Sequence, residues 1–181
     1  MPRLTVVDPA TATGRAKELL GELEVEFGRT SNLTLAMAVN PAVLEGWIAL
    51  NTALGSTLSR RLEEQIAIAV AEENGCGYCL AAHTALGRRV GIEEHELALS
   101  RAGESSDPSV AAALRFARAV NEKRGRVSDR DLAEVRTAGY DDADIAAIVG
   151  HVVLNALTNY FNGVAQTEID FPEVERGRAA A

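Results

Sequence analysis

Apolar residues recur at helical spacing along nearly the whole chain, and no segment shows the sustained alternation typical of a strand. Capping residues, glycines and prolines divide this pattern into short intervals, each of which predicts one helix. The expected helices cover residues 11–27, 32–39, 41–54, 59–74, 76–90, 93–101, 108–123, 128–136 and 141–165. The pattern therefore predicts an all-α, multi-helix fold. A length of 181 residues favours a single domain over residues 1–181, whose tail beyond Pro172 is expected to fray.

The last expected helix is apolar on most faces but carries a polar stripe. The stripe consists of His151, Asn155, Asn159 and Asn162, at spacings of four, four and three. Because buried amides need hydrogen-bond partners, the stripe is expected to line an active cavity or to pair across a subunit boundary. A partly exposed polar face is the plainer interpretation. So apolar a helix is rarely enclosed by two layers of helices, which predicts a homo-oligomer.

Composition excludes several classes of partner. The net charge of −8 makes nucleic acid and anionic membrane poor partners. No apolar run approaches the ~20 residues that a membrane span needs, and the N-terminus lacks the apolar core of a signal peptide. We therefore expect a cytoplasmic protein. The chain has two cysteines, which in that compartment indicate redox or metal chemistry before a structural disulfide.

Both cysteines lie in one short stretch, at Cys76 and Cys79, and His83 follows four residues after the second. On a helix these three side chains fall on one face, because neighbours on a helix surface are three, four and seven residues apart. Asn74-Gly75 interrupts the preceding helix, so the first cysteine lies near a helix N-terminus. The helix dipole and a nearby protonated histidine both favour the thiolate form of cysteine.

Glu64 lies about three turns before this interruption, so a helical hairpin would bring its carboxylate beside His83. The carboxylate would then orient the imidazole, and the imidazole would take the proton of a thiol. From spacing alone Glu63, one residue away, would serve as well. Two other interpretations remain open. Cys76 and Cys79 could be inert buried cysteines, or they could bind zinc together with the histidine and the glutamate, although structural zinc sites are usually richer in cysteine.

This constellation resembles the alkylhydroperoxidase D-like branch of the carboxymuconolactone decarboxylase family. The resemblance rests on four residues and their spacing, Glu64, Cys76, Cys79 and His83. It extends less specifically to residues 58–61, 152–159 and 169–172. In peroxidases of this family a second histidine often precedes the second cysteine, and this chain has Tyr78 at that position.

The resemblance implies an antioxidant enzyme, a thiol-dependent peroxidase that reduces hydrogen or alkyl hydroperoxides without a metal or cofactor. Cys79 would attack the peroxide, Cys76 would resolve the product to a disulfide, and Glu64 and His83 would move protons. In relatives the dithiol reductant is a lipoyl protein or a peroxiredoxin, and the assembly is a trimer or a hexamer. Two alternatives are a carboxymuconolactone decarboxylase-like lyase, against which the cysteine pair counts, and a non-catalytic relative that senses redox state.

Overall fold

The computed structural model describes residues 2–172 and 174, and within them the chain forms α-helices and no strand. In chain order these helices are α1 (Gly14–Phe27), α2 (Asn32–Met37), α3 (Pro41–Leu54), α4 (Arg60–Glu73), α5 (Gly77–Arg89), α6 (Glu94–Arg101), α7 (Pro108–Glu122), α8 (Asp129–Thr137) and α9 (Asp142–Ala165). Each helix expected from the sequence is present, with ends that differ by a few residues at most. The predicted all-α fold is thereby confirmed.

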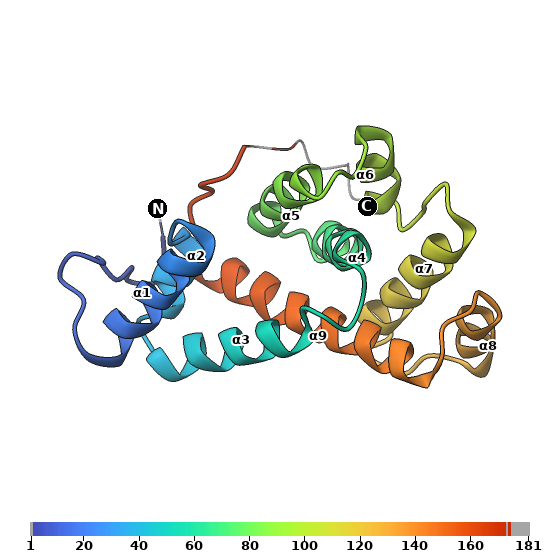
Figure 1. The fold of residues 1–181 in the computed structure, drawn as a ribbon, viewed down its shortest axis with the longest axis horizontal. Helices are drawn as coiled ribbons and strands as arrows, with labels where there is room; N and C mark the ends of the chain where they lie inside the picture. Colours follow the sequence, from blue (N-terminus) through green and yellow to red (C-terminus); the bar gives the residue numbers. More distant parts are fainter. Residues whose placement is uncertain (1, 173, 175–181) are drawn as a thin grey trace.

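Helix α4 lies at the centre of this arrangement, packed against α5, α6, α7 and α9 (Figure 1). Every residue from Leu62 to Ala71 is buried, and the first part of this run includes Glu63, Glu64 and Gln65. Because buried charges need partners, the first turns of α4 mark a polar region inside an otherwise apolar interior.

Helices α4 and α5 form the predicted hairpin. Gly75 has a φ of +67°, in the left-handed region that glycine adopts readily, so the chain reverses sharply between the two helices. The N–H of Cys76 then donates a hydrogen bond to the carbonyl of Ala71. Cys76 is the N-cap of α5, and its Sγ accepts a hydrogen bond from the N–H of Cys79 across 3.3 Å. The turn therefore places the first thiol at a helix N-terminus, as expected.

Helix α9, with 24 residues, runs along α3 and beneath α4 (Figure 1). Asp141 caps it and forms a reciprocal capping box with Asp144, which fixes where the helix begins. All four members of the polar stripe are buried, namely His151, Asn155, Asn159 and Asn162. The interpretation as a partly exposed polar face is therefore wrong, because this stripe points into the molecule.

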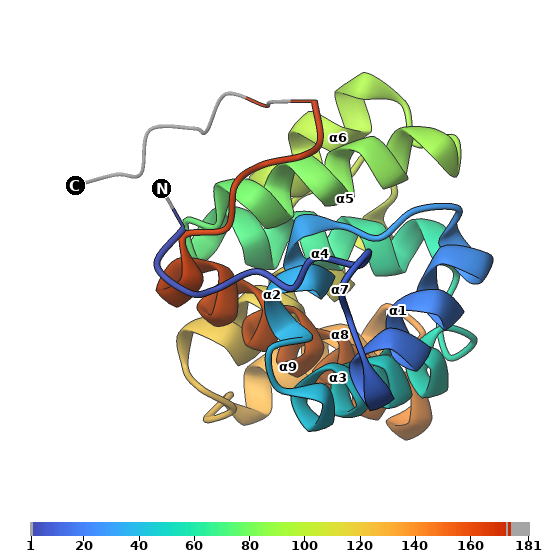
Figure 2. The same cartoon turned by 90° about the vertical axis from the view of Figure 1, so that its left-hand side faces the viewer.

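Beyond α9 the chain runs back over α5 (Figure 2). Asp170 ties this segment to the start of α2 by accepting a hydrogen bond from the N–H of Asn32 across 3.1 Å. The fraying expected beyond Pro172 concerns residues that lie outside the described part of the chain, except for Val174. In the described part, none of the helices has the length and apolar character needed to cross a membrane.

Candidate active site

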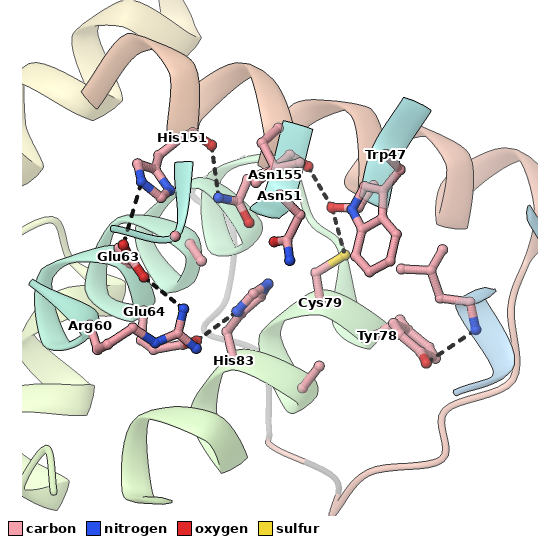
Figure 3. A pocket seen from close by; sticks show the side chains of 16 residues that line it. Trp47, Asn51, Arg60, Glu63, Glu64, Tyr78, Cys79, His83, His151 and Asn155 are labelled. Atoms are coloured by element: carbon pink, nitrogen blue, oxygen red, sulfur yellow. Dashed lines mark hydrogen bonds and ion pairs between the residues drawn. The ribbon is translucent and has the colours of Figure 1, made fainter. Parts of the chain in front are cut away.

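A cavity of about 100 Å³ opens between α3, α4, α5 and α9 (Figure 3). One part of its wall is apolar, formed by Leu33, Trp47, Ala67, Ala82 and Leu154. The polar part includes Arg60, Glu63, Glu64, Cys79, His83 and His151. A single water molecule needs about 10–15 Å³ of such space, so the cavity has room for a small ligand.

The two thiols are free, buried and in direct contact, with their sulfur atoms 2.7 Å apart. Cys79 forms part of the cavity wall, whereas Cys76 lies behind it in the turn between the helices. Asn162 of α9 donates a hydrogen bond from Nδ2 to the Sγ of Cys79 across 3.2 Å. Thr158 lies farther off, with its Oγ1 4.0 Å from the same sulfur. One end of the polar stripe thus faces the thiol that lines the cavity.

The surroundings of the two thiols push their pKa values apart. The hydrogen bond from the Cys76 thiol is the main reason that the pKa of Cys79 is lowered to about 6. Burial raises this pKa, whereas the charge of His83 and the hydrogen bond from Asn162 lower it further. The same contact with Cys79, together with burial, raises the pKa of Cys76 above its ordinary value. Cys79 is therefore the thiolate and Cys76 the proton-bearing partner.

His83 and Glu64 form the pair that the hairpin was expected to create. The Nδ1 of His83 donates a hydrogen bond to Oε2 of Glu64 across 2.8 Å, and the carboxylate is buried. Burial lowers the pKa of His83, but the hydrogen bond and charge of Glu64 outweigh it, so the pKa lies above its ordinary value. The imidazole lines the cavity one helical turn after Cys79 and is suited to hold a proton there.

Glu63, the alternative that spacing left open, does not contact His83 in the described hydrogen bonds. It accepts a hydrogen bond from Nη1 of Arg60 at 2.8 Å, and its Oε1 faces Nε2 of His151 at 3.8 Å. Arg60 also reaches Glu64, with 3.7 Å between Nη2 and Oε1. The two adjacent carboxylates of α4 therefore serve different histidines, and one arginine lies beside both.

Tyr78 is buried at the opposite end of the cavity from these carboxylates (Figure 3). Its hydroxyl donates a hydrogen bond to Asp170 and accepts one from the N–H of Leu33. Burial, together with the Asp170 hydrogen bond, raises the pKa of the phenol. The tyrosine is thus held by α2 and by the segment after α9.

Sequence reasoning brought together the four residues of the resemblance but missed part of the cavity wall. Trp47 and Asn51 were not singled out from the sequence, although both line the cavity. Their spacing of four residues on one face of α3 was the available signal. Arg60 entered only as part of the less specific resemblance over residues 58–61. In the part of the chain that the structure describes, no three or more His, Cys, Asp and Glu side chains group closely enough to hold a metal ion.

Comparison with known proteins agrees with this geometry. The model of the carboxymuconolactone decarboxylase family matches residues 41–122, which include all of α3, α4 and α5. No curated protein sequence matches the chain.

Three solved structures share the fold. A peroxidase-related protein with an alkylhydroperoxidase AhpD core from Ralstonia eutropha JMP134 is 23% identical, over 93% of this chain and 92% of its own, with a TM-score of 0.83. A peroxidase-related protein from Silicibacter sp. TM1040 is also 23% identical, over 92% of each chain, with a TM-score of 0.78. The third structure is the debrominase Bmp8, a cysteine-to-alanine variant in complex with 2,3,4-tribromopyrrole. It is 18% identical, over 93% of this chain and 91% of its own, with a TM-score of 0.79. Residues 41–122 of this chain thus match the carboxymuconolactone decarboxylase family, and the chain as a whole has the alkylhydroperoxidase D-like fold.

Proposed function

We propose that this protein is a thiol-dependent peroxidase that reduces hydrogen peroxide or small alkyl hydroperoxides. The observation that carries the proposal is the setting of Cys79 in the cavity wall. Its sulfur lies 2.7 Å from the Cys76 sulfur and accepts a hydrogen bond from Asn162, and its pKa is lowered to about 6. A small cavity with a thiolate, a second thiol in contact and a proton-holding histidine fits peroxide chemistry.

In the first step the Cys79 thiolate attacks the terminal oxygen of the hydroperoxide. A sulfur–oxygen bond forms as the oxygen–oxygen bond breaks, so the sulfur is oxidised to a sulfenic acid and the peroxide is reduced. The departing alkoxide takes a proton from His83, whose raised pKa keeps a proton available. Glu64 acts through His83, because its carboxylate orients the ring and stabilises the protonated form.

In the second step Cys76 attacks the sulfenic sulfur of Cys79. A disulfide forms, and the sulfenic hydroxyl leaves as water after it takes up the thiol proton of Cys76. An external dithiol must then reduce the disulfide by exchange. By analogy with the family, this reductant is a lipoyl protein or a peroxiredoxin, and the protein works as a trimer or hexamer. The exposed apolar side chains on one face of α9 support such an assembly.

The fold neighbours support the same class of reaction. Two of them are named as peroxidase-related proteins, and the third is a debrominase with a bromopyrrole bound. A thiolate that attacks oxygen could in another member attack halogen, so 2,3,4-tribromopyrrole is the natural competing substrate in the assay. Release of bromide without peroxide reduction would assign this chain to that second reaction.

The test is intact mass before and after one equivalent of peroxide. Loss of two hydrogens per chain is the expected result, because one disulfide forms. A Cys76→Ser variant should still reduce one equivalent and accumulate sulfenic acid, whereas a Cys79→Ser variant should reduce none. If the two variants behave the other way round, the roles of the thiols are reversed.

The same experiment separates the remaining alternatives. A redox sensor would form the disulfide but would not turn over when a dithiol such as dihydrolipoamide is present in excess. A lyase would leave the peroxide and both thiols unchanged. Multiple turnovers with the dithiol are expected for the peroxidase.

A further inference from the structure

The cavity has two polar ends, and the proposed peroxidase reaction uses only part of it. Cys79 lies at one end, Glu63 and His151 lie at the other, and His83 and Asn155 lie between them (Figure 3). Glu63 of α4 and His151 of α9 lie 88 positions apart in the chain, yet both side chains line the same cavity. The far end therefore needs its own explanation.

Glu63 has an oxygen without a hydrogen-bond partner. The residue is only 5% exposed, and Arg60 donates to its Oε2, but its Oε1 accepts no hydrogen bond from the described part of the protein. His151 Nε2, at 3.8 Å, is too far for one. Burial raises the pKa of Glu63 and Arg60 opposes that shift. A buried carboxylate oxygen left unsatisfied is costly, and native proteins rarely leave one without reason.

His151 borders the same gap, but its N–H has another partner. Its Nε2 lies 3.3 Å from Oγ1 of Thr57, whose own hydroxyl proton goes to the carbonyl of Leu54 at 2.7 Å. Because the threonine oxygen must then accept, the histidine carries its proton on Nε2. Burial lowers the pKa of His151, which favours the neutral ring. The gap thus has an unsatisfied acceptor on the Glu63 side, whereas the N–H of His151 is already donated to Thr57.

We propose that Glu63, beside His151, forms a specificity site that binds a hydroxyl group of the substrate at the end away from Cys79. A hydroxyl donates one hydrogen bond, and the unsatisfied Oε1 of Glu63 is the acceptor for it. The inference rests on the proposed peroxidase function and narrows its substrates to small hydroxylated hydroperoxides. The peroxide group meets Cys79 and the hydroxyl meets Glu63.

Glu63→Gln tests this site with almost no change in volume. Arg60 donates to Oε2, so the amide oxygen must take that place and the NH₂ group must point toward the gap. The acceptor is thereby replaced by a donor, so the proton of a substrate hydroxyl would lose its partner at position 63. Glu73→Gln is the matched control. Glu73 is a partly buried carboxylate of the same helix that contacts Asn121 and lies outside the cavity wall.

Binding is measured on a Cys76→Ser, Cys79→Ser background, which cannot turn over. Trp47, the only tryptophan of the chain, lines the cavity and reports occupancy by its fluorescence. The two probes, 2-hydroxyethyl hydroperoxide and n-propyl hydroperoxide, have the same number of heavy atoms and differ by one hydroxyl. We expect 2-hydroxyethyl hydroperoxide to bind at least about tenfold more tightly than n-propyl hydroperoxide. The reason is that n-propyl hydroperoxide cannot make the hydrogen bond to the charged carboxylate. Glu63→Gln should reduce this preference, because the hydrogen bond to a charged carboxylate is lost, and Glu73→Gln should keep it.

His151→Phe provides a second variant if Glu63→Gln does not fold, and it should also reduce the preference. Equal binding of the two probes, or a preference unchanged by both cavity variants, would overturn the inference. Because the serine background does not react, this outcome is independent of the peroxidase assay on the parent protein. If the parent protein binds the hydroxylated probe but reduces no peroxide, the proposed function is overturned. The inference that the substrate is a hydroxylated hydroperoxide is then overturned as well.

Discussion

The hydroxyl of Tyr78 donates a hydrogen bond to Oδ1 of Asp170 across 2.7 Å, although the two residues lie 92 positions apart in the chain. Phe171 packs edge-on against the tyrosine ring, with 5.8 Å between the ring centroids. Arg29 lies over Phe171 and also pairs with Asp170. Tyr78, which directly precedes Cys79, thus holds the segment after α9 and makes no described hydrogen bond to the Glu64–His83 pair.

Tyr78→Phe is therefore expected to affect stability more than reactivity. The substitution leaves the buried N–H of Leu33 without its partner, so the free energy of unfolding should fall by about 1–3 kcal/mol, measured in urea. Tyr140→Phe is the control, because the Tyr140 hydroxyl makes no hydrogen bond within the described part of the chain, and its effect should stay within ~0.5 kcal/mol. Peroxide reduction by folded Tyr78→Phe should remain within about twofold of the parent. A large loss of rate at unchanged stability would show that the phenol takes part in proton transfer.

The contact between Glu64 and His83 leads to a kinetic prediction. General acid–base groups contribute about 10²–10⁴-fold to rate, so Glu64→Gln and His83→Phe should each slow peroxide reduction by such a factor. Stopped-flow measurement of the first turnover is the assay, with circular dichroism to confirm the fold. Glu73→Gln, on the same helix but outside the cavity, should be mild. Rates within twofold of the parent for both relay variants would exclude the proposed roles.

The lowered pKa of Cys79 predicts how the reaction depends on pH. Its thiolate is the reactive form, so the first-turnover rate should fall as pH drops through about 6 and should level off above it. Asn162→Leu removes a donor to the thiolate, which should raise the pKa and move the profile to higher pH. Ultraviolet absorbance of the thiolate gives the same titration without peroxide. A midpoint near the ordinary thiol value in the parent protein would contradict this assignment.

The helices could be predicted from the sequence because the signals that begin and end them are local. Ser59, Ser128 and Asp141 begin three of the helix ranges expected from the sequence, and each accepts a hydrogen bond from the first turn of its helix. Residue spacing could not decide whether Glu63 or Glu64 contacts His83. Neighbouring residues on a helix point about 100° apart, and the geometry of the hairpin determines which one meets the histidine. Only the family resemblance selected Glu64.

Other parts of the site depend on contacts between distant segments. The polar stripe of α9 was visible as a pattern, but periodicity shows which residues share a face and not what that face meets. The structure places Asn162 against Cys79 and His151 near Glu63. The partnership of Tyr78 with Asp170 had no local signal at all, since it depends on the path of the chain after α9.

The face of α9 opposite the stripe leads to the last prediction, which concerns assembly. Val153, Leu157, Tyr160 and Val164, spaced four, three and four, are 40–62% exposed. Such an apolar row on a long helix favours association, and closed symmetry is the default for contacts between identical chains. We propose a homo-oligomer, a trimer or hexamer by family analogy, built on this row.

Sedimentation equilibrium at micromolar concentration should therefore give a mass that is a multiple of 19.2 kDa. Leu157→Glu should shift the equilibrium toward the monomer, because it places a charge in the apolar contact and charged groups are depleted at interface cores. Val25→Glu is the control, since Val25 is an isolated apolar residue of α1 with 89% exposure, and it should leave the mass unchanged. A parent protein that sediments as a clean monomer would refute the assembly. The α9 row would then be a solvent-facing surface, and the active cavity would have to function within one chain.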